Sequence, residues 1–274
     1  MDEHEVYPNP PVVLVALEVR HPTSEPLTSS EERAIKSHLG ARLPIARTAQ
    51  LASFQMVAGS LVAPTPNVET FIRYMDRKST VAVSFRRDAM TVEASVYPGW
   101  DEFQVIIAEA IDARMRVAPV DGVERIGVRY IDEIRVPSDG GEPTWGDWVS
   151  SSLLPPKPSE PVDLQLTQWQ GVAVYGGQPG HTLILRYGPM TGFAVDPSSE
   201  LRRGKPADGG KYFLMDIDSF WTPDGSVPEL DRDNVLRTCN DLHRPVRSLF
   251  EGLIQPKLRD EVFRSHESDA ATGL

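Results

Sequence analysis

The segment RIGVRYIDEIRV at residues 125–136 decides the fold class, because polar and apolar side chains alternate along most of its length. Successive side chains of a β-strand point to opposite faces of the sheet. One face would carry Arg125, Gly127, Arg129, Ile131, Glu133 and Arg135. The other face would carry Ile126, Val128, Tyr130, Asp132 and Ile134. The segment is therefore predicted to be a long strand.

Other parts of the chain have strand patterns too. The run VVLVALEVR at residues 12–20 is apolar and rich in β-branched residues, and it follows Pro10 and Pro11. Such a run is typical of a buried strand. Further strands are predicted at about residues 49–57, 81–85, 90–96, 164–175, 182–187, 192–196 and 212–220.

Three helices are predicted from caps and apolar stripes. Ser29 and Glu32 have the spacing of a capping box, and Gly40 offers a stop. A second helix begins at Trp100 and has apolar residues on one face. The last helix covers about residues 231–254, and Pro245 within it predicts a kink or a break near residues 241–244.

These elements predict an α+β fold with antiparallel sheets and long amphipathic helices packed on one face. A parallel sheet would need regular alternation of strands and helices, which the sequence lacks. Each half of the chain places strands before a long helix, so we consider two similar halves at residues 1–120 and 121–264. We expect one structural unit over residues 1–264 and a flexible tail over 265–274.

Composition excludes several classes of protein. The 274 residues include 28 Lys and Arg and 39 Asp and Glu, for a net charge of 28 − 39 = −11, which argues against general nucleic-acid binding. A single cysteine excludes an internal disulfide framework. No apolar run reaches the roughly 18 residues of a membrane helix, and the acidic start is unlike a signal peptide. We expect a cytoplasmic protein without a membrane segment.

Four ordered motifs carry a resemblance that spans almost the whole chain. They are YPNPPVV at 7–13 followed by EVR at 18–20, WDEF at 100–103, VERIGVRYIDEI at 123–134 and LHRPVRSLFE at 242–251. Together they resemble a sporadically distributed family of uncharacterised prokaryotic proteins of similar length. The resemblance implies a single family unit and no activity, and the patchy distribution suggests a mobile or defence-type system. Pro245 departs from the family pattern, which puts an ordinary helix former there.

Arginines and carboxylates on the predicted strands are candidate ligand-binding groups. Arg125 and Arg129 flank Gly127 and have the chemistry to clamp a carboxylate or a phosphate. Asp216 and Asp218 share one side of a strand, where they could bind Mg²⁺ or share acid–base work. The alternative is that these groups pair with each other across strands, with Arg186 as a further partner.

The last helix places Cys239 and His243 on the same face, four residues apart, which is a conceivable nucleophile pair. Cys239 also lies on the apolar stripe, where a cysteine behaves as a small hydrophobe. The loop at residues 204–211 fails the spacing of a phosphate-binding loop. We therefore assign no catalytic residue, no metal site and no cofactor.

Trp145 and Trp148 lie in a long Pro-rich connection at residues 137–161. They could anchor a protein partner, because aromatic side chains concentrate interface energy. The alternative is that they close over the core as a lid.

Two function hypotheses follow. The first is a non-enzymatic accessory or regulatory subunit that binds a protein partner of unknown identity, with homo-oligomer formation left open. The second is a small-ligand binder or an undescribed enzyme with a polar pocket between the sheet and the last helix. The second hypothesis predicts that six side chains converge in one cavity: Arg125, Arg129, Tyr130, Asp216, Asp218 and His243.

Overall fold

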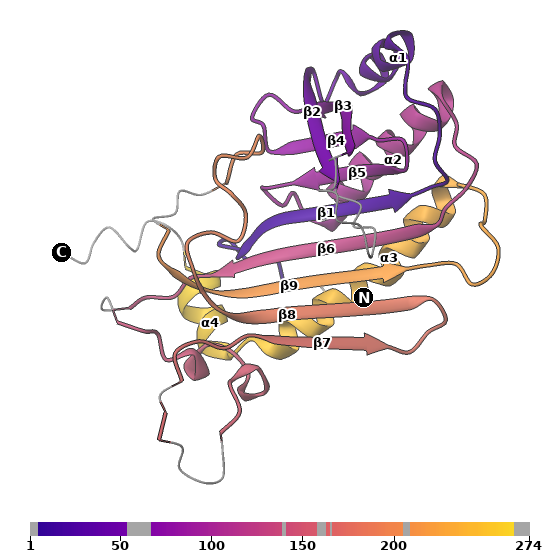
Figure 1. Cartoon of the computed structure of the whole chain (residues 1–274). Coiled ribbons are helices and arrows are strands. Elements are labelled where there is room, and N and C mark those ends of the chain that lie inside the picture. Colours follow the sequence, from indigo (N-terminus) through magenta and orange to yellow (C-terminus); the bar gives the residue numbers. More distant parts are fainter. Residues whose placement is uncertain are drawn as a thin grey trace, which may run out of the picture.

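A nine-stranded antiparallel sheet forms the centre of the described part of the protein (Figure 1). The computed structural model describes residues 5–53, 67–138, 141–157, 163–164, 166–204 and 209–265. The strands are β1 (Val12–Arg20), β2 (Ile45–Ser53), β3 (Asn67–Met75), β4 (Val81–Phe85), β5 (Ala89–Ala94), β6 (Arg125–Ile134), β7 (Gly171–Gly176), β8 (His181–Thr191) and β9 (Lys211–Trp221). Their spatial order is β2-β3-β4-β5-β1-β6-β9-β8-β7. The predicted α+β class with an antiparallel sheet is confirmed.

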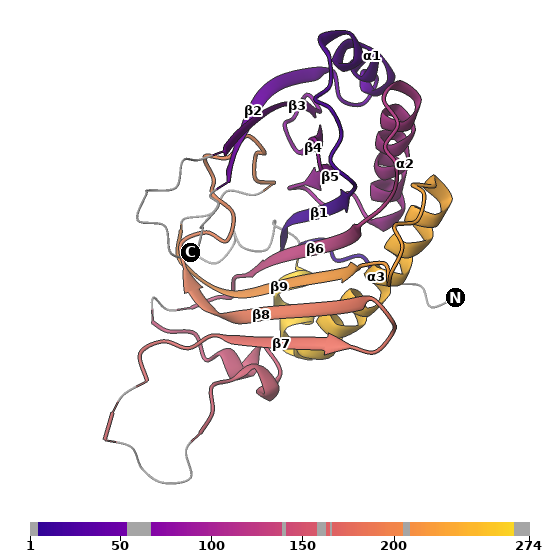
Figure 2. The ribbon, with the colours of Figure 1, turned by 45° about the vertical axis from the view of Figure 1, so that its right-hand side comes forward.

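The two sides of the sheet have similar strand pairings, although β1–β5 supply five strands and β6–β9 supply four. In the first half β1 pairs with β5, β5 with β4, and β4 with β3. In the second half β6 pairs with β9, β9 with β8, and β8 with β7. The halves meet where β1 pairs with β6, and Figure 2 shows these two strands side by side at the middle of the sheet.

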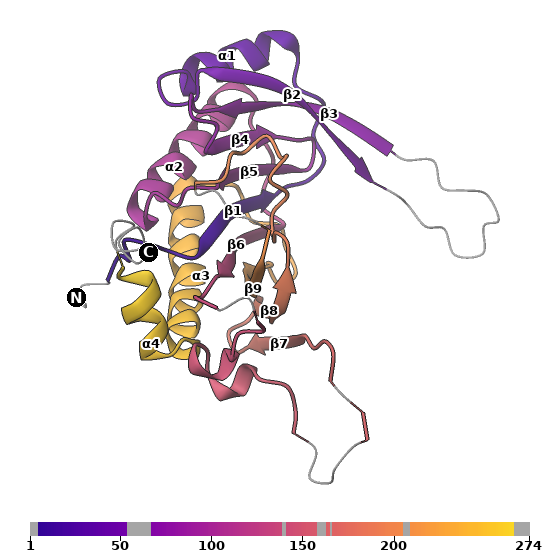
Figure 3. The same cartoon turned by 90° about the vertical axis from the view of Figure 1, so that its left-hand side faces the viewer.

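Helices α1 (Ser29–Leu39), α2 (Trp100–Val117) and α3 (Arg232–Leu253) pack against the sheet (Figure 3). The first contacts β3, the second contacts β5, and the third contacts β6 and β9, while neighbouring helices also contact one another. A short α4 (Pro256–Leu258) and a last turn at Arg259–Phe263 follow. None of the described helices is long and apolar enough to span a membrane.

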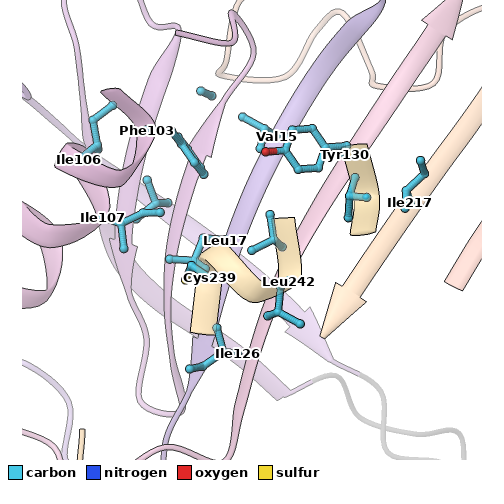
Figure 4. Packing of buried hydrophobic residues seen from close by; sticks show 14 of the residues in the cluster. Val15, Leu17, Phe103, Ile106, Ile107, Ile126, Tyr130, Ile217, Cys239 and Leu242 are labelled. Atoms are coloured by element: carbon cyan, nitrogen blue, oxygen red, sulfur yellow. The ribbon is translucent and has the colours of Figure 1, made fainter. Parts of the chain in front are cut away.

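The hydrophobic core lies between the helices and the central strands. Figure 4 shows Cys239 and Leu242 of α3 beside Leu17 of β1 and Ile126 of β6. All four side chains are at most 2% exposed. This contact explains the apolar stripe of the last helix, because the stripe is the side that leaves water.

The capping box of α1 begins one residue earlier than predicted. Thr28 is the N-cap, and its hydroxyl accepts the backbone N–H of Glu31. The Glu31 carboxylate in turn accepts the N–H of Thr28 at 2.7 Å. Ser29 is therefore the first helical residue.

Of the kink or break predicted near residues 241–244, the break does not occur, because α3 runs without interruption from Arg232 to Leu253. Proline removes one helical hydrogen bond, that to the carbonyl of Asp241. Both Asp241 and Pro245 are exposed, so water can reach the freed carbonyl. Buried Leu242 and Val246 continue the apolar stripe on either side and hold the helix on the sheet.

The observed strands differ from the predicted strands at four places. Strand β3 (Asn67–Met75) was not predicted, and residues 192–196 form no strand because β8 ends at Thr191. The strand predicted at 164–175 begins only at Gly171. The strand predicted at 49–57 is observed at 45–53, and residues 54–57 lie outside the described part, as does the tail at 266–274.

Candidate functional site

The six predicted ligand-binding residues do not share one cavity, because they divide between the two faces of the sheet. Tyr130 points toward α3, where it meets His243. Since side chains alternate along a strand, neighbouring Arg129 points to the face away from α3. The other three residues on that face are Arg125, Asp216 and Asp218.

On the face away from α3, arginines and carboxylates pair across strands. Arg129 forms a two-point contact with Asp216, with nitrogen–oxygen distances of 2.7 and 2.8 Å. Arg186 reaches the same carboxylate at 3.5 Å. Arg125 lies 3.2 Å from Asp218 and also 3.2 Å from Glu18. This geometry is the cross-strand pairing that we considered as the alternative to ligand binding.

Gly127 allows Arg125 to lie flat along the strand. A Cβ atom at position 127 would come within 2.6 Å of the Arg125 guanidinium. The same guanidinium lies over the ring of Phe220, 4.4 Å from its centroid. The glycine therefore serves the packing of an ion pair between strands.

On the face toward α3, an aromatic cluster surrounds His243. The Tyr130 hydroxyl lies 3.0 Å from His243 Nδ1 and 3.4 Å from the hydroxyl of Tyr97. The indole of Trp100 stacks on the imidazole with 4.0 Å between ring centroids. Trp100 also donates its Nε1–H to the side chain of Asn240 at 2.7 Å. The cluster thereby joins the start of α2 to the middle of α3.

An open cavity of about 670 Å³ adjoins this cluster. Its walls come from the N-terminal segment 5–13, the turn at 95–100, one side of α3 and residues 262–263. The strands contribute Val12 and Val13 of β1, Tyr130, Asp132 and Glu133 of β6, and Ile217 of β9. Most lining residues are apolar or aromatic, and this size is ordinary for a small-molecule site. We call it the Asp132 cavity.

Asp132 is the most unusual group in this cavity. Its side chain is buried, with 5% of the residue exposed, and it makes no hydrogen bond or ion pair with the described residues. Burial, together with the smaller effect of the nearby Asp216 carboxylate, raises the pKa of Asp132 to about 8. The carboxyl group is therefore largely protonated at neutral pH, when it can both donate and accept a hydrogen bond.

Sequence reasoning did not select Asp132, although a signal was present. The residue is the only charged group on the apolar face of the 125–136 strand. A carboxyl among Val128, Tyr130 and Ile134 is costly to bury unless it has a partner. Its presence on this face therefore suggests a function. The absence of a partner in the described residues became visible only from the structure.

Glu133, the next residue, fixes one side of the cavity. Its carboxylate accepts two hydrogen bonds from Arg203 at 2.6 and 2.7 Å, one from Arg135 at 2.8 Å and one from the N–H of Ala194 at 2.7 Å. Burial disfavours its charge, but these donors outweigh that effect and lower the pKa of Glu133. The contacts hold residues 192–204 against the sheet, and Arg203 and Gly204 line the cavity.

Cys239 lies in the hydrophobic core. Its residue is 0% exposed, and burial raises the pKa of the thiol to about 12. A thiolate is the reactive form of cysteine, so this environment suppresses reactivity. His243 directs its ring to Tyr130 and Trp100.

Trp145 and Trp148 are 6% exposed and belong to the core. The ring of Trp145 lies 5.3 Å from that of Phe213, and its N–H contacts Glu142. The Lys257 ammonium lies 4.3 Å from the Trp148 ring centroid. This geometry supports the lid alternative, and partner binding through these indoles stays a prediction.

Comparison with known proteins adds no further constraint. No protein-family model, no curated protein and no solved structure matches the chain.

Proposed function

We propose that this protein binds a small, mainly apolar ligand in the Asp132 cavity. The observation that carries the proposal is the Asp132 carboxyl, buried at the cavity surface with no partner among the described residues. The Asp132 oxygens reach the cavity surface, because they are not among the fully buried, unpartnered atoms of the described residues. A ligand with a polar head would hydrogen-bond to this carboxyl, and its apolar body would contact Tyr7, Tyr97 and Phe250.

Filling the cavity tests this proposal. Val13 is half-buried and lines the cavity at the irregular start of β1, so Val13→Trp should occupy the space that a ligand needs. We expect the neutral dye Nile red to bind the native protein saturably and Val13→Trp to weaken that binding at least about tenfold. Fluorescence titration measures the affinity, and circular dichroism checks the fold.

The matched control is Val172→Trp, at an exposed valine on β7 that does not line the cavity. This variant should bind Nile red as the native protein does. Equal binding by Val13→Trp and the native protein would show that the dye binds elsewhere and would remove support for the proposal.

We further propose that the two halves, residues 1–120 and 121–264, arose by duplication, with α2 and α3 equivalent and on the same side of the sheet. The similar strand pairings support this. So do matching Glu-x-Arg ends, where Arg20 contacts Glu18 at 2.7 Å and Arg135 contacts Glu133 at 2.8 Å. Aligning these ends places Asp132 opposite Leu17, which is 0% exposed in the core. A test is superposition of the two halves in an experimental structure, where unrelated Cα paths would refute duplication.

A second candidate function is partner binding as an accessory subunit. The observation that favours it is edge strand β7, where Val172 and Val174 are each 66% exposed. An exposed apolar edge strand can pair with a strand of another chain. We expect the native protein to self-associate and Val174→Lys to reduce that association in sedimentation velocity. Monomeric native protein at all concentrations would argue against a homo-oligomer through this edge.

A further inference from the structure

We propose that the ligand of the Asp132 cavity is an organic cation, a protonated amine on an apolar body, whose ammonium group contacts the Asp132 carboxylate. This inference rests on the proposed function and specifies the chemistry of its ligand. Among the described residues, no cationic side chain near Asp132 pairs with its carboxyl group.

The arginines that line the cavity are engaged by other groups. Arg135 and Arg203 both bind Glu133. Arg247 of α3 donates to the backbone carbonyl of Glu5 at 2.7 Å. None of the three forms an ion pair with Asp132. A carboxylate at position 132 would therefore take its counter-charge from the ligand.

The acids near the cavity also have partners. Glu251 of α3 accepts from Tyr7 at 2.9 Å and from Arg259 at 3.1 Å, while Glu5 pairs with Arg264 at 2.6 Å. Asp216 on β9 pairs with Arg129 on the other face and disfavours the Asp132 charge. The protein as a whole carries a net charge of −11, which attracts cations over longer distances.

Aromatic rings give the cavity a second attraction for a cation. Tyr7, Tyr97, Trp100 and Tyr130 line it, and His243 lies against Trp100 and Tyr130. The face of an aromatic ring attracts an ammonium group by about 0.5–2 kcal/mol, more when water is excluded. A neutral ligand would gain nothing from this attraction between a positive charge and the ring faces.

Binding of the cation is coupled to a proton. Below pH 8 the Asp132 carboxyl holds a proton, which leaves to solvent when the ammonium group arrives. The affinity for an amine that stays protonated should therefore rise with pH between 6 and 8 and level off above pH 8. A neutral ligand of the same shape would show no such rise.

Isothermal titration calorimetry with 2-phenylethylammonium tests the inference, with 2-phenylethanol and 3-phenylpropionate as neutral and anionic relatives. At pH 8 we expect the amine to bind at least about tenfold more tightly than the alcohol, and this preference to shrink at least about tenfold at pH 6. Titrations in two buffers of different ionisation enthalpy should show proton release at pH 7.

Asp132→Asn should abolish the preference for the amine over the alcohol, and circular dichroism checks that the variant is folded. Equal affinity of the native protein for the amine and the alcohol would overturn the inference, and so would an unchanged preference in Asp132→Asn. If Nile red binds the cavity and the amine shows no preference, only the ligand class is wrong. If Val13→Trp leaves Nile red binding intact, the cavity itself is not the binding site.

Discussion

Replacing Asp132 by asparagine is expected to make the protein more stable than the native protein, by an amount that grows as the pH rises. In the unfolded chain an aspartate ionises near pH 4, whereas the pKa of Asp132 in the folded protein is about 8. Between these values the unfolded chain releases a proton that the folded protein keeps. The native protein therefore loses stability as the pH rises from about 4 to about 8, and the loss is constant above that range.

The expected size follows from about 1.4 kcal/mol for each pKa unit. Between pH 5.5 and pH 8, the free energy of unfolding of the native protein should fall by about 3 kcal/mol relative to that of Asp132→Asn. Asparagine has a similar shape and no charge at any pH, so the difference isolates ionisation of one group.

Urea unfolding at a series of pH values measures this difference. The matched control is Asp121→Asn, which removes an exposed carboxylate. Its unfolding free energy should run parallel to that of the native protein. If the curve of Asp132→Asn also runs parallel, Asp132 is charged and solvated in the folded protein, and the proposed site loses its basis.

Replacing Glu133 by glutamine is expected to destabilise the protein by about 3–5 kcal/mol, because it leaves two poorly exposed guanidinium groups without their carboxylate. The Glu133 side chain is 1% exposed, and Arg203 and Arg135 are 13% and 26% exposed. Residues 192–204 should also detach, since Ala194 and Arg203 bind the sheet through this carboxylate. Trypsin should then cleave at Arg202 and Arg203 faster than in the native protein.

The matched control is Glu93→Gln, which removes a carboxylate from a strand of the other half. Glu93 pairs with Arg73 at 2.5 Å, but its side chain is 25% exposed, so water can replace part of the lost contact. We expect a loss of about 1 kcal/mol and no change in tryptic cleavage at 202–203. Similar losses in both variants would mean that Glu133 has no special role in holding the loop.

Period-two and helical patterns were sufficient to predict most of the framework. The apolar run at 12–20, the alternation at 125–136 and the stripe of the last helix all correspond to observed elements. These patterns work because each element has one side in the core. Strand β3, NVETFIRYM, escaped prediction because Ile72 and Tyr74 on one face are matched by Phe71 and Met75 on the other.

The site was harder to predict than the framework, because it depends on which strands become neighbours. The alternating strands allowed pairing of Arg129 with Asp216 as an alternative to ligand binding, and the structure has this pair. The cavity needs the N-terminal segment 5–13 to meet α3, and no local pattern specifies that contact. The sequence shows an aspartate at position 132, but whether its carboxyl group has a partner depends on every segment that packs around it.

The position of β1 in the sheet has a consequence for how the chain emerges from the ribosome. Its partner β5 is made only after α1, β2, β3 and β4, and its other neighbour β6 is made after α2. Such distant pairings slow folding, because loop closure precedes the gain from contact. A nascent chain whose emerged part ends between residues 95 and 124 would present the apolar strand VVLVALEVR with one edge open. A ribosome stall that exposes the chain only up to this interval should therefore produce an aggregation-prone intermediate until residues 125–134 emerge to cover the edge.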